Sequence, residues 1–134
     1  LRFDCGMTGT HVGCEHGICG ACTILFNNEP VRSCLMLAPQ IDEGEITTIE
    51  GISENNKYDD LREAFKKYHA LQCGYCTPGF ITTIVYLLEK KQFLKEEEIR
   101  EKLSGNICRC TGYTGIVKAV EEVFLNRFKK SKND

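Results

Sequence analysis

The sequence predicts an α+β fold of two small domains, one over residues 1–52 and one over residues 53–134. Three observations support this prediction. Short β-branched segments separated by turn residues occupy the first half. A helical period of apolar residues dominates the second half. Eight of the nine cysteines fall into two groups of four, one in each half, and domains this small need such additional stabilisation because their cores are thin.

The composition limits the classes of partner. The net charge is −2, with net −6 in residues 1–56 and +4 in residues 57–134, so there is no general case for a nucleic acid or membrane partner. The longest apolar-rich run, 80–88, is too short to span a bilayer. An odd number of cysteines and no signal peptide favour a reduced, cytoplasmic location over a secreted disulfide scaffold. Because the chain begins at Leu1, we expect it to be processed or cut from a longer parent.

The first half is expected to be a helix end, a loop and a small sheet. Gly6 and Gly9 should end the helix within residues 1–12. Cys5 belongs to neither group of four and is interpreted as a small core side chain. Strands are expected over residues 21–26, 30–35 and 46–50, with a turn at 27–29 joining the first two.

The second half is expected to be helical. The polar segment 51–56 lacks periodicity and reads as the linker. Thr77 should cap one helix, with Pro78 at its first position. The tail from Lys129 has nothing to bury. Helices are predicted over residues 59–69, 78–91, 95–104 and from Gly112 or Gly115 to 128.

The first group of four cysteines has the spacing C-x4-C-x2-C, with the fourth eleven residues further on. This is the spacing of plant-type ferredoxins, in which four thiolates hold a 2Fe–2S cluster. The glycines between them allow positive φ and bring backbone N–H groups near the cluster. A structural zinc site also uses four cysteines but prefers two C-x2-C pairs. The predicted ligands are Cys14, Cys19, Cys22 and Cys34.

The second group consists of one CxxC pair and one CxC pair, each just before a predicted helix. Free N–H groups at a helix N-terminus favour an anionic cluster there. Zinc remains an alternative for this group, and so does a redox disulfide at Cys73 and Cys76, although no thioredoxin-like βαβ pattern surrounds it. Because the first group already predicts a 2Fe–2S cluster, a second 2Fe–2S cluster is the preferred interpretation of this group. The predicted ligands are Cys73, Cys76, Cys108 and Cys110.

Four motifs in this order resemble the iron–sulfur subunit of the xanthine oxidase family of molybdenum hydroxylases. They are GCEHGICGACT from Gly13, VRSCL from Val31, QCGYCTPGF from Gln72 and NICRCTGY from Asn106. The resemblance implies a plant-type ferredoxin-like (β-grasp) domain followed by a four-helix 2Fe–2S domain. It also implies electron transfer from molybdopterin on a large subunit, through two clusters, towards FAD on another subunit. Gln72 and Cys110 would lie near the pterin, and the first cluster would lie towards the flavin.

The sequence departs from the family pattern in one respect, and the branch of the family stays open. Family members carry a β-hairpin and a helix before Thr8, and here only the end of that helix, residues 1–4, is expected. The sheet would therefore lack its first strands, with the missing edge belonging to the parent chain or covered by a partner. No catalytic base, molybdenum ligand or flavin motif occurs, so the chain is not expected to be catalytic alone. The branch, whether hydroxybenzoyl-CoA reductase, nicotine, caffeine, aldehyde or carbon monoxide dehydrogenase-like, stays open, and a zinc-stapled structural module is the alternative function.

Overall fold

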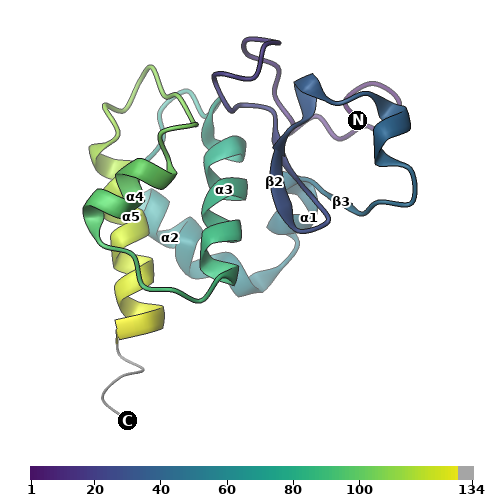
Figure 1. Ribbon diagram of the computed structural model, residues 1–134. Helices are drawn as coiled ribbons and strands as arrows, with labels where there is room; N and C mark the ends of the chain where they lie inside the picture. Colours follow the sequence, from purple (N-terminus) through teal and green to yellow (C-terminus); the bar gives the residue numbers. More distant parts are fainter. Residues whose placement is uncertain (130–134) are drawn as a thin grey trace.

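The computed structural model describes residues 1–129 and combines a small antiparallel sheet with a group of helices (Figure 1). Three strands form the sheet in the order β2-β1-β3. Their bounds are β1 Thr23–Phe26, β2 Glu29–Arg32 and β3 Ile46–Thr47. An α+β fold is therefore confirmed, and all strands among residues 1–129 come from the first half of the chain.

The hairpin of β1 and β2 sets the position of everything that follows it. Asn27 and Asn28 join the strands with φ of 49° and 63°, the backbone that a two-residue turn needs to match the strand twist. Thr23 then pairs with Arg32 across the strands. The predicted second strand was too long, because Ser33–Leu35 forms a 3₁₀ turn. That turn ends the ladder and turns the chain away from the sheet.

The segment predicted as a third strand and a linker is partly helical. Only Ile46–Thr47 pairs with β1, and α1 (Ile49–Ser53) follows at once. Ile52 within it is buried, so this part of the predicted linker contributes to the core. The carboxylate of Glu50 also accepts a hydrogen bond of 2.7 Å from the N–H of Gly9, which fixes the N-terminal loop to α1.

All four helices predicted for the second half are present. Acidic residues begin α2 and basic residues end it, as the helix dipole favours. The N-cap of α3 is Cys76 and not Thr77, which is the first helical residue. The bounds are α2 Asp59–Lys67, α3 Thr77–Glu89, α4 Glu96–Lys102 and α5 Thr114–Phe124, which continues as the π-helical turn Leu125–Lys129.

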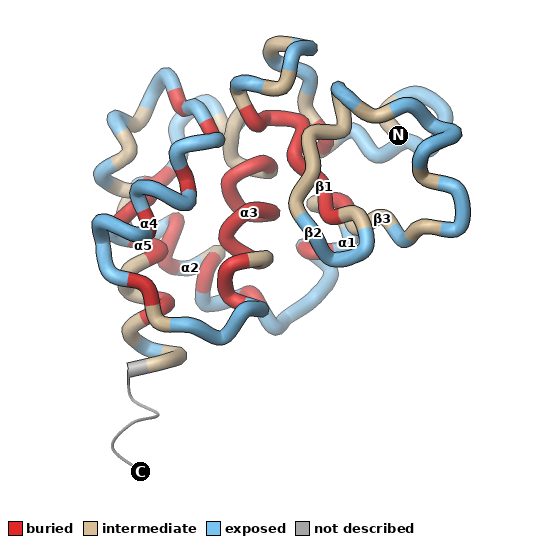
Figure 2. The backbone as a smooth tube through the Cα atoms, viewed as in Figure 1, coloured by how far each residue is buried: buried red, intermediate tan, exposed pale blue. Residues whose placement is uncertain are grey.

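Helix α3 lies between the sheet and the other helices and is buried along most of its length (Figure 2). It packs against β1 on one side, while α2 and α5 pack against each other beside it. One core cluster therefore runs from Leu25 of β1 through Phe80 and Ile84 of α3 to Phe124 of α5. The two halves of the sequence share this core and do not form separate ones.

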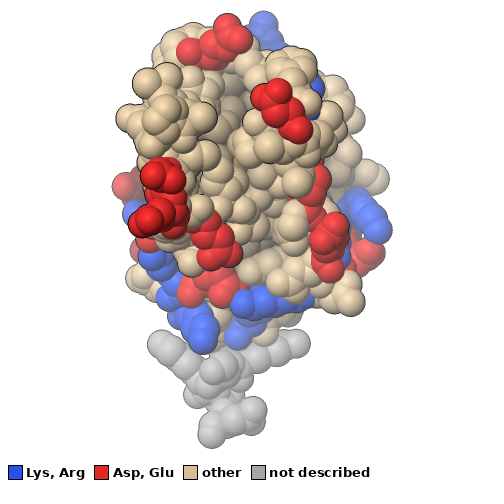
Figure 3. Space-filling view, turned by 90° about the vertical axis from the view of Figure 1, so that its right-hand side faces the viewer, with Lys and Arg blue, Asp and Glu red and all other residues tan. Residues whose placement is uncertain are grey.

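The N-terminal segment differs from the prediction in two ways. Residues 2–4 form a turn and not the end of a helix. Cys5 is exposed, so its interpretation as a core side chain was wrong. This segment borders an apolar groove of about 460 Å³ on the sheet face opposite α3, lined by Ile24, Ile41 and their neighbours. Figure 3 faces this side of the molecule and shows a hollow in a largely uncharged surface with acidic side chains near its edges.

Among the described residues, none of the helices combines the length and apolar character needed to cross a membrane. The predicted tail lies largely outside the described residues, since only Lys129 falls within them.

Candidate metal centres

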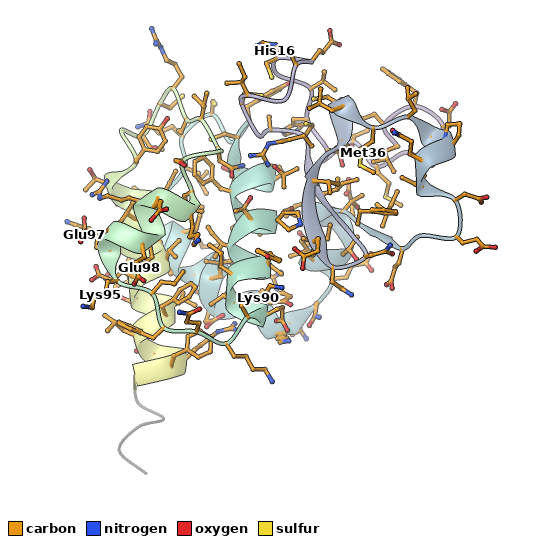
Figure 4. All side chains as sticks on the ribbon, in the orientation of Figure 1. His16, Met36, Lys90, Lys95, Glu97 and Glu98 are labelled. Carbon is orange, nitrogen blue, oxygen red and sulfur yellow. The ribbon has the colours of Figure 1, made fainter. Side chains whose placement is uncertain are left out.

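Both groups of cysteines lie at the same end of the molecule. The loop before β1, the loop between α2 and α3, and the loop between α4 and α5 meet above the N-terminus of α3 (Figure 1). His16, on the first of these loops, marks this end in Figure 4, and Lys90, after the last residue of α3, marks the opposite end. The fold thus brings together cysteines that are far apart in the sequence.

The first loop supplies Cys14, Cys19 and Cys22 on a backbone with repeated left-handed residues. Glu15, Gly17 and Gly20 have φ of 57°, 84° and 74°. The resulting turn lets the N–H of Cys19 donate to the Sγ atom of Cys14 at 3.4 Å. This hydrogen bond is the largest cause that lowers the pKa of Cys14 to about 6. A thiolate is therefore favoured at this position before any metal binds.

Cys34 reaches the first loop because the hairpin returns the chain. The N–H and the hydroxyl of Ser33 both donate to the carbonyl oxygen of Cys22, at 3.3 Å and 2.8 Å. Cys34, in the 3₁₀ turn that follows β2, is then a neighbour of Cys22, and burial raises its pKa. The first four predicted residues are thus together, as two neighbouring pairs: Cys14 with Cys19, and Cys22 with Cys34.

The second group also forms two pairs. The Sγ atoms of Cys73 and Cys110 are 3.5 Å apart, and both residues are exposed. Cys76 neighbours the buried Cys108, and burial raises the pKa of Cys76 to about 12. The pairs join the loop before α3 to the loop before α5, so all eight predicted ligands are assembled into two groups.

Thr111 is the side chain that most affects the inner pair. Its hydroxyl donates to the Sγ atom of Cys108 at 3.0 Å, and its N–H donates to the same sulfur at 3.4 Å. Burial raises the pKa of Cys108, but these hydrogen bonds, together with those from Cys110 and Cys76, outweigh it and lower the pKa overall. The N–H of Cys108 itself donates to the hydroxyl of Tyr113 at 3.1 Å, which fixes the backbone of this loop.

The donors are arranged as pairs and not around one point. Within residues 1–129, no three His, Cys, Asp or Glu side chains converge as the ligands of a single metal ion would. A 2Fe–2S cluster has two irons, and each iron takes two thiolates, so it requires two neighbouring pairs and not a single tetrahedron. The chemistry and the grouping of the donors therefore fit one such cluster per group.

The two loop systems are joined by contacts that the sequence did not indicate. Asn106, the first residue of one quoted motif, is 2% exposed and donates to the carbonyl oxygen of Gly20 at 3.1 Å. On the surface, the ring of His11 stacks on Tyr75 with centroids 4.5 Å apart. The hydroxyl of Tyr75 donates to the carbonyl oxygen of Val12 at 2.7 Å.

The outer surface of this end is partly apolar. Gln72, predicted to contact a pterin, is exposed beside Cys73. His16 is exposed too, and its Nδ1 atom lies 2.5 Å from the carbonyl oxygen of Cys14. Between and around these residues, several large apolar side chains are 42–60% exposed, namely Ile18, Leu35, Leu71, Tyr75 and Ile107.

Comparison with known proteins supports the assignment of the donors to iron and sulfur. A family model described as a 2Fe–2S binding domain matches residues 48–121. The chain is 51% identical over 126 residues to the caffeine dehydrogenase subunit gamma of a Pseudomonas species, covering 92% of this chain and 75% of the relative. It is 54% identical over 120 residues to the nicotine 6-hydroxylase small subunit of Paenarthrobacter nicotinovorans, covering 90% of this chain and 72% of the relative.

A solved structure agrees with these relatives. Quinoline 2-oxidoreductase from Pseudomonas putida 86 superimposes with a TM-score of 0.87 at 43% identity, over 99% of this chain and 81% of that one. Fold, donors and matches together define an iron–sulfur protein of the 2Fe–2S class. The chain belongs to the iron–sulfur small subunits of the xanthine oxidase family of molybdenum hydroxylases.

Proposed function

We propose that this chain is the electron-transfer subunit of a molybdenum-dependent oxidoreductase. It carries two 2Fe–2S clusters and conducts electrons from molybdopterin on a large subunit towards FAD on a further subunit. It is not catalytic alone. The observation that carries the proposal is the presence of four neighbouring cysteine pairs, in two groups, at one end of one fold.

Each pair of cysteines is assigned to one iron. Cys14 with Cys19 and Cys22 with Cys34 hold the first cluster. The second cluster is held by the remaining two pairs, Cys73 with Cys110 and Cys76 with Cys108. When bound, such a cluster accepts and releases one electron at a time. Thiols must lose their protons to bind, so Cys14 is ready at neutral pH, whereas iron binding at Cys76 must displace a proton, which is released to the solvent.

The protein around each cluster has defined roles. Backbone N–H groups and the hydroxyl of Thr111 donate to sulfur, which stabilises negative charge there. Cys22 and Cys108 are buried, which limits the access of water to one side of each group. The other side remains open to partners, because Cys73 and Cys110 are exposed.

The family resemblance implies one orientation of the relay, and the exposure of Cys73 and Cys110 supports it. We place the second cluster towards the molybdopterin subunit, with Gln72 and Cys110 at the pterin, and the first cluster towards the FAD subunit. The exposed apolar side chains support this placement, since Leu71, Tyr75 and Ile107 surround the second group and Ile18 and Leu35 lie by the first. Apolar patches of this kind mark protein interfaces. Interfaces are expected over residues 69–76, 106–114 and 13–20.

The finer architecture belongs to the same proposal. Residues 1–52 would be the plant-type ferredoxin-like (β-grasp) domain, incomplete at its N-terminus, and residues 53–134 the four-helix 2Fe–2S domain. The segregation of the strands into the first half and of α2 to α5 into the second supports this division, and the family match over residues 48–121 covers most of the helical part. A cytoplasmic location is supported by the nine free cysteines, since eight of them must stay reduced to bind iron.

Metal content and cysteine variants test the assignment. Protein purified without oxygen should contain about four irons and four acid-labile sulfides per chain, with two electron paramagnetic resonance signals on reduction. Cys76→Ser should remove roughly half of the iron and one signal, and Cys22→Ser should remove the other signal. Two zincs without labile sulfide, or loss of both signals from either variant while the fold survives, would falsify the two-site assignment.

Gln72 tests the direction of the relay. In the assembled complex, Gln72→Ala should slow the reduction of the clusters by substrate severalfold, because this route crosses the pterin contact. Reduction by dithionite should keep its rate, because dithionite donates to the clusters directly. Gln92→Ala is the matched control, since Gln92 is an exposed glutamine after the far end of α3. Equal slowing by both reductants, or substrate oxidation by the isolated chain, would contradict the relay.

A further inference from the structure

A buried polar contact lies between the two groups of cysteines. The amide of Asn106 is 2% exposed. Its Nδ2 atom donates to the carbonyl oxygen of Gly20 at 3.1 Å and lies 3.5 Å from the hydroxyl of Thr23. Its Oδ1 atom accepts from the hydroxyl of Thr83 at 3.0 Å. One side chain thus connects the first cysteine loop, β1 and α3.

A direct backbone hydrogen bond lies next to this amide. The N–H of Ile107 donates to the carbonyl oxygen of Cys19 at 2.9 Å. Cys19 belongs to the first group, and Ile107 directly precedes Cys108 of the second group. One link between the two groups therefore runs from the carbonyl group of Cys19 through this hydrogen bond and residue Ile107 to Cys108.

The surfaces at this junction are packed without spare room. A Cβ atom at Gly79 of α3 would overlap the carbonyl oxygen of Gly20, and a Cβ atom at Gly20 would lie 2.5 Å from the carbonyl oxygen of Gly105. Arg32 of β2 also donates to the hydroxyl of Thr23, at 2.6 Å, and to the carbonyl oxygen of Gly105. Glycine allows the close approach, and hydrogen bonds from side chains fix it.

We propose that Asn106 is a positioning residue that holds the two cluster loops at one separation and keeps the hydrogen bond from Ile107 to Cys19 closed. The proposal rests on the ligand assignment above. Electron exchange between redox centres falls steeply with separation and is favoured by bonded paths over gaps. A loose junction would leave both clusters in place and impair the exchange between them, which is why the position requires two buried hydrogen bonds.

Asn106→Ala in the cluster-loaded protein is the test. It leaves the carbonyl of Gly20 and the hydroxyl of Thr83 without this partner, while every cysteine remains. Two measurements report the junction: the magnetic interaction between the two reduced clusters by electron paramagnetic resonance, and hydrogen exchange of a peptide that includes Ile107. With iron retained, we expect a weakened interaction and about tenfold faster exchange or more, as the loss of a buried hydrogen bond implies.

Two matched comparisons separate positioning from general stability. Asn55→Ala removes a side chain that accepts a 3.0 Å hydrogen bond from the N–H of Lys57 at an exposed position, and it should change neither measurement. Thr83→Val removes the hydroxyl that lies 3.0 Å from both the Oδ1 atom of Asn106 and the carbonyl oxygen of Gly79, and it should produce a smaller form of the same effect. Thr83→Ser keeps that hydroxyl and should restore the behaviour of the unmodified chain.

Each outcome decides the proposal. If Asn106→Ala keeps its iron with unchanged magnetic interaction and unchanged exchange, Asn106 is only a satisfied core amide and the proposal fails. If Asn106→Ala loses iron, the Thr83 pair decides: a weakened interaction in Thr83→Val that Thr83→Ser restores supports the proposal, and identical behaviour of the two overturns it. Failure of the proposed function would look different, because the unmodified chain would then lack two clusters.

Discussion

The two groups of cysteines solve the same chemical problem with different parts of the chain. The first is built mainly by one continuous loop, whose left-handed residues direct a backbone N–H at Cys14. The second is built by two separate loops, and its inner sulfur, on Cys108, receives a side-chain hydroxyl as well as an N–H. The first environment therefore depends on glycine and turn geometry, whereas the second depends on which side chain follows the CxC pair.

The two groups also differ in exposure. In the first group three cysteines are half-buried and Cys22 is buried. In the second, Cys73 and Cys110 are exposed and Cys108 is buried. Reduction potential depends on hydrogen bonds to sulfur and on solvent exposure, so two clusters with identical ligands acquire different potentials in one chain. The comparison teaches that ligand identity fixes the cluster type while the surrounding protein differentiates the two.

Glycine substitutions give the largest expected effect in this comparison. Gly20 and Gly74 have similar φ, 74° and 80°, and each lies in a cysteine loop. A Cβ atom at Gly74 would meet no atom within 4 Å, so Gly74→Ala should lower the free energy of unfolding by about 1–2 kcal/mol through backbone strain alone. Gly20→Ala adds overlap with Gly105 and Asn106, so it should also lose the first cluster.

Iron content and denaturant unfolding measured on both variants check this difference. Gly74 serves as the control for the intrinsic cost of a side chain at positive φ. Similar losses of stability and iron in the two variants would show that crowding at the junction is not what distinguishes the loops.

A change in potential is the next effect in size. Thr111→Val removes the hydroxyl that donates to Cys108 and keeps the shape of the side chain. This hydrogen bond strengthens as the cluster gains negative charge, so its loss should lower the potential of the second cluster. A differential of about 1 kcal/mol corresponds to about 40 mV for one electron.

Redox titration followed by electron paramagnetic resonance measures the two potentials separately. Thr77→Val is the matched control, because Thr77 likewise follows a cysteine pair but makes no hydrogen bond to sulfur through its hydroxyl within residues 1–129. An unchanged second potential in Thr111→Val, or an equal shift in the first, would contradict the assignment of this hydroxyl to one cluster.

The features predicted correctly from the sequence are those that residue spacing and hydrophobic periodicity encode. Four helices were located within a few residues, because apolar residues at helical spacing face one core. The ligand spacing of the first loop indicated its chemistry, and the hairpin explained how Cys34 reaches it. Helix α1 was missed because it is a single short turn between a strand and a polar segment, where tertiary contacts such as the burial of Ile52 outweigh propensity.

The junction between the halves was beyond sequence reasoning. Asn106 and Gly20 are 86 positions apart, and nothing in local pattern pairs them. Treating 51–56 as a linker implied two independent cores, whereas α3 packs on β1 and shares one buried core cluster with the other helices. Thr77 was assigned as the cap because its side chain suits that role, but the helix begins one position earlier.

The smallest expected effect concerns Cys5, the cysteine outside both groups. Because Cys5 is exposed and not buried, Cys5→Ser should change the free energy of unfolding by no more than about 0.5 kcal/mol. Iron content and both magnetic signals should remain, since the two groups of four are complete without it. In the cluster-loaded chain a thiol-reactive maleimide should label Cys5 alone, since the other eight sulfurs are bound to iron, and Cys5→Ser should abolish the labelling. Loss of iron from Cys5→Ser, or labelling of Cys73 or Cys110 in the loaded chain, would show that the division of the nine cysteines into two groups and one bystander is wrong.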